Sequence, residues 1–284
     1  ALAVAAVAIV GRFALESGAV GDRIARISVD GIIFTDPTRV AILEDIAEDP
    51  LVRALVVSIN SPGGTTAGGE ELYESLARVR AGKPVVAVIH ELGASAAYMT
   101  AIGADRIFAR RLSIVGSIGV LYQHVDAGKL LATIGIDLDK VQTGPLKAEP
   151  DLDEPLAGDV RRSLQALVDD SFAWFVDVVA ERRALPRPEV LALADGRIVT
   201  GRQAVEASLI DAIGGEAEAT AWLEAERDLA ADLPVIDYYP LPEENWLNLP
   251  AWLTGMARGA LGFDPAQPIA LDGLVSLWHA GPAK

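Results

Sequence analysis

Residues 54–89 read ALVVSINSPGGTTAGGEELYESLARVRAGKPVVAVI, and this stretch decides the fold. Its two ends, 54–59 and 84–89, are short apolar runs typical of buried strands. Between them, apolar side chains recur at the spacing of one helix face: Leu72, Leu76 and Val79. A strand, a helix and a strand at this spacing predict a right-handed crossover and a parallel sheet that is covered on both sides.

The alternation of strands and helices extends beyond this stretch. Residues 23–29 alternate apolar and polar side chains as a strand does, and residues 40–47 suit a helix. Helical spacing returns in residues 160–179, 201–207 and 216–229. The sequence therefore predicts an α/β fold with βαβ crossovers and a mainly helical C-terminal part.

Composition limits the chemistry that this chain can perform. Acidic residues outnumber basic ones 40 to 24 among 284 residues, and the formal net charge of −16 argues against a nucleic-acid partner. The chain has no cysteine, which excludes disulfides, thiolate nucleophiles and metal–thiolate sites. Its three histidines leave little material for a metal site, so we expect neither a metal nor a cofactor.

The two ends of the chain differ from its middle. Residues 1–10 are apolar and uncharged but shorter than the about 20 residues that span a bilayer. We interpret 1–22 as the end of a membrane anchor with its spacer, with a buried leader as the alternative. Residues 23–232 form the predicted main domain. We expect the Pro- and Trp-rich tail, 233–284, to pack on that domain, with a membrane or a neighbouring subunit as alternatives.

A turn-like motif, Ser61-Pro62-Gly63-Gly64, follows the first of the two apolar runs. Glycine allows backbone conformations that are denied to other residues, and proline fixes one φ angle. Such a turn can aim free backbone N–H groups at a single point, as an oxyanion hole requires. An ordinary tight turn into a helix is the alternative.

Ser95 lies among small residues, Gly93-Ala94-Ser95-Ala96-Ala97, just after the second apolar run. Small neighbours allow a substrate backbone to approach the serine closely. A helix that starts here would place the hydroxyl at the positive end of the helix dipole, and the N–H of Ala96 would be a second oxyanion donor. The alternative is a helix N-cap, a role that serine often fills.

Lysine is scarce in this chain, with five lysines against nineteen arginines. One of them, Lys147, follows Thr143-Gly144-Pro145-Leu146. Unlike arginine, a lysine can lose its proton when burial lowers its pKa, and a neutral amine beside Ser95 would act as a general base. A surface lysine is the alternative.

Together these segments resemble the signal peptide peptidase A family, serine peptidases that use a Ser–Lys dyad on the crotonase-like fold shared with the Clp protease. The resemblance covers about residues 24–230. It rests on the Ser-Pro-Gly-Gly motif, the serine among small residues and a Gly-x-x-Lys placed 52 residues after that serine. Further matches are Gly116-Ser117-Ile118-Gly119-Val120, Gly196-Arg197, Thr200-Gly201 and Leu209-Ile210-Asp211.

The resemblance implies a role for each residue of the site. Ser95 would be the nucleophile, Lys147 the general base and Ser117 the hydroxyl that orients the lysine. The amides of Gly63 and Ala96 would form the oxyanion hole. We expect the peptide substrate to lie extended beside Gly63 as an added strand.

One departure from the family concerns the residues after the nucleophile. The family often has two glycines there, where this chain has Ala96 and Ala97. Both amides survive this change, but two methyl groups narrow the groove, which bears on substrate size rather than on catalysis.

The resemblance also implies an assembly and a place in the cell. We expect a homo-oligomer, a ring or dome in which Lys147 of one subunit serves Ser95 of the next. The implied location is the bacterial inner membrane, with the catalytic domain on the periplasmic or extracytoplasmic side. The implied substrates are cleaved signal peptides or other hydrophobic peptides.

Two other interpretations stay open. In the first, His124 is the base and Asp126 its partner, as in the Clp protease. A histidine base would give an activity limb near pH 6–7, and a lysine base a higher one. In the second, the chain is a non-proteolytic scaffold or an acyl-CoA enzyme of the crotonase type, which needs an oxyanion hole but no nucleophile. Of the remaining histidines, His90 and His279 are expected to be structural.

Overall fold

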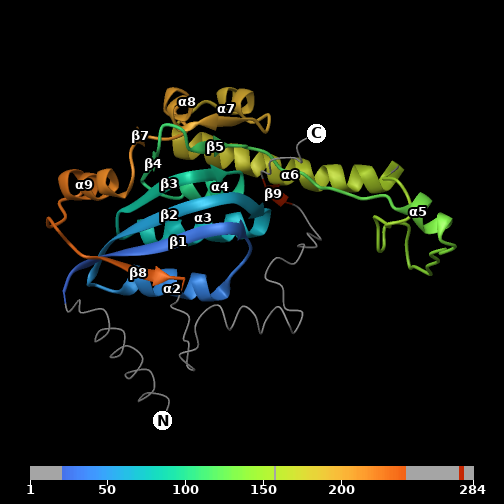
Figure 1. Ribbon diagram of the computed structural model, residues 1–284, viewed down its shortest axis with the longest axis horizontal. Helices are drawn as coiled ribbons and strands as arrows, with labels where there is room; N and C mark the ends of the chain where they lie inside the picture. Colours follow the sequence, from blue (N-terminus) through green and yellow to red (C-terminus); the bar gives the residue numbers. More distant parts are fainter. Residues whose placement is uncertain (1–20, 157, 241–274, 278–284) are drawn as a thin grey trace, which may run out of the picture.

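The fold centres on one mixed, mostly parallel sheet (Figure 1). The computed structural model describes residues 21–156, 158–240 and 275–277. Within them, the sheet consists of β1 (Arg23–Ile33), β2 (Val52–Thr65), β3 (Val85–Ala94), β4 (Arg106–Ala109), β5 (Ile114–Gly116), β6 (Ile198–Thr200), β7 (Ala212–Ile213), β8 (Val235–Tyr239) and β9 (Val275–Leu277). The main order is β6-β5-β3-β2-β1-β8; β4 pairs with β3 and β7, and β9 pairs with β2.

The central strands have the parallel pairing that the sequence predicts. Val57 of β2 lies opposite Ile27 of β1 on one side and opposite Ala87 of β3 on the other. Two pairings are antiparallel, that of β5 with β6 and that of β2 with β9. The α/β fold is therefore confirmed, with an antiparallel contribution at two places in the sheet.

Helices cover both faces of this sheet. Within the described residues the helices are α2 (Pro37–Glu48), α3 (Thr66–Arg80), α4 (Ala96–Ala101), α5 (Gly128–Thr133), α6 (Gly158–Arg183), α7 (Arg187–Leu193), α8 (Gly201–Glu206) and α9 (Glu216–Glu226). Of these, α5 lies away from the sheet (Figure 1). Along β2, Leu55 and Val57 join the core that α2, α3 and α4 complete, whereas Ala54 and Val56 pack with α9. This alternation follows from the two-residue period of a strand.

The Ser-Pro-Gly-Gly motif continues β2 to Thr65, so it does not form the ordinary tight turn that the sequence analysis gives as the alternative. Ile32 and Ile33 of β1 lie opposite Gly63 and Gly64, after an irregularity in the pairing. A Cβ atom at Gly64 would lie 1.9 Å from the carbonyl oxygen of Ile33, so only glycine allows the two strands to approach this closely. The irregularity also accommodates Pro62, which has no N–H to donate to a ladder.

Two segments of the predicted tail belong to the sheet. β8 runs parallel to β1, with Val235 opposite Ile24, and β9 pairs with the last residues of β2. The predicted anchor, residues 1–20, and most of the tail lie outside the described residues. Among the described helices, none combines the length and the apolar character needed to cross a bilayer.

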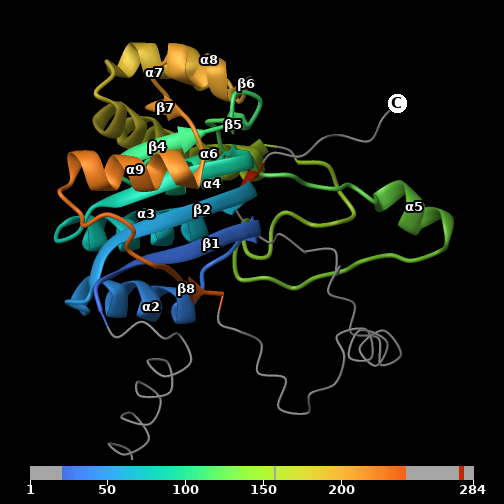
Figure 2. The same ribbon diagram turned by 60° about the vertical axis from the view of Figure 1, so that its left-hand side comes forward.

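Residues 121–156 project from the body of the molecule, and we call this segment the arm (Figures 1 and 2). It carries α5 and leads into α6, of which only the C-terminal half is buried in the core, around Phe175 and Val179. Large apolar side chains are exposed along the arm: Leu121, Val125, Leu130, Ile134, Ile136, Leu138, Val141, Leu146 and Leu152. Exposed apolar surface of this extent is typical of a face that contacts a partner.

Candidate active site

Ser95 occupies a sharp turn between β3 and α4. Its backbone has φ 61° and ψ −121°, a combination that L residues rarely adopt and that costs about 1–3 kcal/mol. The residue stands at the N-cap position, but its side chain makes no capping hydrogen bond. Ser95 is only 1% exposed. A strained serine between a strand and a helix is the arrangement in which a nucleophilic hydroxyl is presented at the edge of a sheet.

Ser117 is held beside Ser95 by the pairing of β3 with β5. Ala94 lies opposite Gly116, and the N–H of Ser95 donates to the carbonyl oxygen of Gly116 at 2.8 Å. The next residue, Ser117, has φ 51° and is 8% exposed. The structure therefore brings the predicted nucleophile and the predicted orienting hydroxyl into adjoining backbone segments.

A second motif of the family resemblance fixes Ser117 from the other side. The N–H of Ser117 donates to the carbonyl oxygen of Arg197 at 2.8 Å. Asp195 closes this turn, because its carboxylate accepts from the N–H of Arg197 at 3.0 Å and from its guanidinium Nε at 2.7 Å. The guanidinium of Arg197 lowers the pKa of Asp195 to about 2, so the turn keeps its charge pair at neutral pH.

The two predicted oxyanion donors come from β2 and α4. Ala96 is the first residue of α4, where backbone N–H groups have no acceptor within the helix. Gly63 has φ 105°, and its N–H donates to the Oγ of Ser61 at 3.1 Å. Ser61 is fully buried and lies opposite Gly93 of β3. An oxyanion would therefore have to take the Gly63 amide from Ser61, a partner that sequence reasoning did not single out.

Close packing behind the site explains how the chain accommodates alanine after Ser95. Ala96 and Ala97 are fully buried. A Cβ atom at Gly69 of α3 would lie 3.0 Å from the Cβ of Ala96 and 2.8 Å from the Sδ of Met99. The methyl group of Ala96 thus faces α3, where a glycine leaves it room.

A hydrogen bond of Tyr98 connects α4 to the C-terminal part of the chain. Its hydroxyl donates to the carbonyl oxygen of Leu209 at 2.7 Å, across 111 residues of sequence. Complete burial raises the pKa of Tyr98, so the phenol stays protonated and keeps donating. This bond connects the segment that follows Ser95 to the Leu209-Ile210-Asp211 motif.

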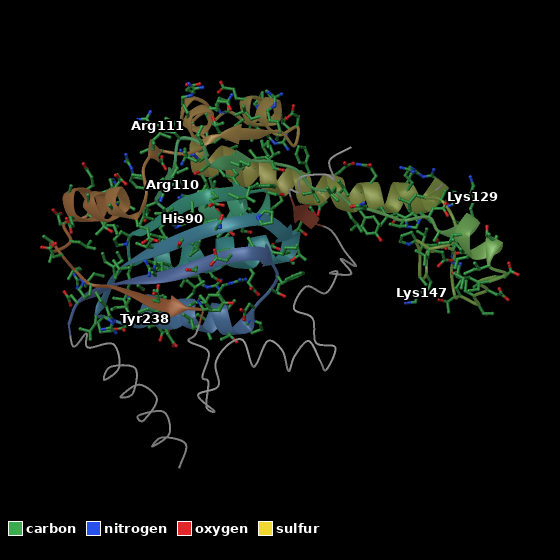
Figure 3. All side chains as sticks on the ribbon, viewed as in Figure 1. His90, Arg110, Arg111, Lys129, Lys147 and Tyr238 are labelled. Atoms are coloured by element: carbon green, nitrogen blue, oxygen red, sulfur yellow. The ribbon has the colours of Figure 1, made fainter. Side chains whose placement is uncertain are left out.

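Lys147 lies far from this cluster within a single chain. It is located on the arm, as Figure 3 shows, and its N–H donates to the carbonyl oxygen of Gly144 at 3.0 Å. The structure of one chain therefore gathers Ser95, Ser117, Ala96 and Gly63 but does not bring the predicted base to them.

The residues of the alternative triad also lie on the arm. The ring Nε2 of His124 is 2.9 Å from the carbonyl oxygen of Glu154, and the carboxylate of Asp126 accepts from the N–H of Gly128 at 2.9 Å. Elsewhere, the ring Nε2 of His90 lies 2.8 Å from the Oγ of Ser58, as a structural histidine would. One chain thus assembles the His124–Asp126 alternative no better than it assembles the Ser–Lys dyad.

Three carboxylates on the arm, those of Glu149, Asp151 and Glu154, lie within 4.8 Å of one another. Lys140 donates to two of them, Asp151 and Glu149. The hydrogen bond to Asp151 contributes most to raising the pKa of Lys140, and the bond to Glu149 contributes next. The lysine therefore balances part of their charge.

Comparisons with known proteins find one matching family and several relatives. The sequence profile of peptidase family S49 matches residues 77–230. The chain belongs to this family of serine peptidases. A protein of Synechocystis sp. that is named a protease is 37% identical over 217 residues, 76% of this chain and 78% of that protein. The SppA protein of Enterococcus faecium, named a signal peptide peptidase, is 31% identical over 238 residues, 79% of this chain and 69% of that protein.

A solved structure supports the fold of this S49 chain. A mutant of the membrane-bound stomatin-specific protease 1510-N matches with a TM-score of 0.52 and 12% identity, over 78% of this chain and 100% of the other. This likeness, together with the family match, confirms the predicted Clp-protease and crotonase-like architecture.

Proposed function

We propose that this S49 chain is a serine endopeptidase in which Ser95 attacks the peptide carbonyl and Lys147 accepts the Ser95 proton. The observation that carries the proposal is the strained strand-to-helix turn at Ser95, with Ser117 fixed on the neighbouring strand segment. A buried serine in such a turn needs a base that can reach it. A Ser–Lys pair is a recognised variant of the Ser–His–Asp arrangement.

The reaction would proceed through an acyl-enzyme. The Oγ of Ser95 adds to the carbonyl carbon while neutral Lys147 takes its proton. The N–H groups of Ala96 and Gly63 donate to the oxyanion, the Gly63 amide leaving the Oγ of Ser61 to do so. The C–N bond then breaks, Lys147 protonates the leaving amine, and water hydrolyses the ester to release Ser95. Ser117 would orient the amine of Lys147.

A second copy of the chain would supply the lysine. The arm carries Lys147 together with nine exposed large apolar side chains, a surface that favours a protein partner. A head-to-tail contact between identical chains closes into a ring when the rotation allows it. We therefore propose that the arm of one subunit packs on the body of the next and delivers Lys147 to its Ser95.

The substrate class and the location are inferred from the relatives and the sequence. The Enterococcus faecium relative is named a signal peptide peptidase, and we propose hydrophobic peptides such as cleaved signal peptides as substrates here. The apolar residues 1–10 support a place at the bacterial inner membrane, with the catalytic domain on the extracytoplasmic side. Recovery of the protein in the soluble fraction of lysed cells would contradict the membrane assignment.

The decisive experiment combines peptide hydrolysis with active-site labelling. A fluorophosphonate probe is applied to the wild-type protein and to the variants Ser95→Ala, Lys147→Ala and Lys129→Ala. Lys129 is the matched control because it is another lysine of the arm (Figure 3). We expect label on Ser95 and hydrolysis in the wild type and in Lys129→Ala, and loss of hydrolysis in the other two, with unchanged circular dichroism.

The same series tests the alternatives. Full hydrolysis by Lys147→Ala together with inactivity of His124→Ala would replace the dyad with the histidine mechanism. A wild-type protein that binds peptides but neither hydrolyses them nor reacts with the probe would support the scaffold interpretation.

A further inference from the structure

β9 lies on the side of β2 where β3 turns away. Gly63 and Gly64 pair with β1 on one side, so β9, which pairs with the same residues, must occupy the other. On that side β2 pairs with β3 up to the pair formed by Ser61 and Gly93. β3 then leaves the sheet at Ser95, and β9 fills the place that it vacates.

β9 pairs with the end of β2 as an added strand, which is the form expected of a bound peptide. It runs antiparallel to β2, with Leu277 opposite Gly63, Ser276 opposite Gly64 and Val275 opposite Thr65. Gly63 is the residue whose amide is a predicted oxyanion donor. A peptide added as a strand at this edge would form the same ladder, because main-chain pairing is how an extended peptide adds to a sheet.

The edge itself offers little besides backbone. Gly63 and Gly64 have no side chains. Only glycine fits at position 64, because a Cβ atom there would clash with the carbonyl oxygen of Ile33. Such an edge recognises extended chain through its N–H and C=O groups and accepts many sequences. The apolar stretch 274–278, LVSLW, has the composition that we propose for substrates.

We infer that Val275–Leu277 is a tethered occupant of the peptide-binding edge and competes with substrates for it. The inference rests on the proposed function in taking this edge as the place of the substrate. Residues 241–274 join the segment covalently to β8, and a tether raises the effective concentration of a ligand at its site. A free peptide must therefore displace β9 before it can pair with Gly63–Thr65.

Hydrogen exchange tests the docking without requiring catalysis. Amide exchange of the peptide that spans residues 60–66 is compared in three proteins: the full chain, a chain that ends at Leu277 and a chain that ends at Leu274. We expect protection in the first two and faster exchange in the third. Equal protection in all three, or its loss already in the chain that ends at Leu277, would overturn the assignment. Protection that falls on dilution of the full chain would mean that a second copy is the occupant, and would also overturn it.

Point variants of the full chain guard against a truncation that unfolds. Successive N–H groups of a strand point to opposite edges, so either Ser276→Pro or Leu277→Pro must remove a donor that faces β2. At least one of them should speed exchange as the shorter truncation does, and Ala280→Pro is the control that should not. Slow exchange in both would contradict the inference.

Hydrolysis then shows the consequence for substrates. If β9 occupies the edge about nine-tenths of the time, ending the chain at Leu274 lowers KM for a hydrophobic peptide about tenfold. An unchanged KM with active enzyme would refute competition. A chain that hydrolyses nothing in any form would refute the proposed function, while the exchange experiment would still decide whether β9 docks at this edge.

Discussion

At the scale of single residues, Ser95 combines two requirements that conflict. Its φ of 61° and ψ of −121° suit glycine, yet only a side-chain hydroxyl can serve as a nucleophile. Gly116 and Arg197 hold this conformation and that of Ser117 through backbone hydrogen bonds of 2.8 Å each. The strain is therefore stored at the residue that would react, and the surrounding strands maintain it.

Replacing Ser95 in two ways measures that strain. Ser95→Ala keeps the strained backbone, whereas Ser95→Gly relieves it, so we expect the glycine variant to be more stable by about 1 kcal/mol although both are inactive. Thermal or urea unfolding of the two variants gives the difference directly. A glycine variant that is no more stable than the alanine variant would show that the turn carries no strain.

Asp195 provides a prediction about pH. Because the Arg197 guanidinium lowers the folded-state pKa of Asp195 to about 2, below the usual value of about 4, this pair stabilises the folded state fully above about pH 4. That stabilisation disappears as the pH falls through 2.

The same carboxylate holds the Arg197 turn that fixes Ser117. Asp195→Asn should loosen this turn and reduce kcat about tenfold, and no limb of the pH profile above pH 5 should move. The exposed pair of Asp177 with Arg187 supplies the control, Asp177→Asn, which should leave kcat unchanged. A shifted limb in Asp195→Asn would refute this role.

At the scale of elements, the contact of α3 with α4 sets the position of the Ala96 amide. Gly69→Ala should lower stability by about 1–3 kcal/mol through overpacking against Ala96 and Met99, although alanine favours a helix. The displaced amide should reduce kcat at least about tenfold. Gly82→Ala is the matched control, since a Cβ atom there would meet nothing within 4 Å. Equal kcat in the two variants would separate α3 packing from the site.

The elements that local pattern determines could be predicted from the sequence. The strands at residues 23–29, 54–59 and 84–89 and the helix around Leu72 and Leu76 are found, because burial imposes their periodicity. The continuation of β2 through Pro62 and Gly63 was not predicted, since it depends on pairing with β1 and not on local preference. β9 has only three residues, and its partner lies more than 200 residues away, so no local signal marks it.

The candidate site, like the fold, has residues that could be predicted from the sequence and a contact that could not. The candidate residues Ser95, Ser117 and Ala96 were found because small residues and glycines mark a sharp turn, and the structure brings them together. Ser61 was missed as a hydrogen-bond partner because only the folded chain brings its Oγ within 3.1 Å of the Gly63 amide nitrogen. The predicted helix over 160–179 exists within α6, but its first apolar residues face no core, and Leu167 is 51% exposed.

At the scale of the whole molecule, the arm and the body are incomplete without each other. The body holds Ser95, Ser117 and the two predicted oxyanion donors, while the arm holds Lys147 and exposed apolar side chains such as Val141 and Leu130 (Figures 2 and 3). Val141→Asp should therefore abolish both assembly and hydrolysis without lowering the stability of the single chain, because a charge on this surface opposes burial against a neighbour. Light scattering and unfolding measure the two effects, and an assembled, active Val141→Asp protein would exclude this surface from the interface.

Mixing two inactive variants tests whether subunits share the dyad. Ser95→Ala retains the lysine, and Lys147→Ala retains the serine. If the base acts on the neighbouring subunit, an equal mixture that is dissociated and reassembled places an intact lysine beside an intact serine at about one junction in four of a head-to-tail ring. Hydrolysis should then return to about a quarter of the wild-type rate. If each chain used its own lysine, every site would lack one partner and the mixture would stay inactive. Reassembly of Ser95→Ala with wild type, which leaves only wild-type serines to react, gives the matched reference of about one half.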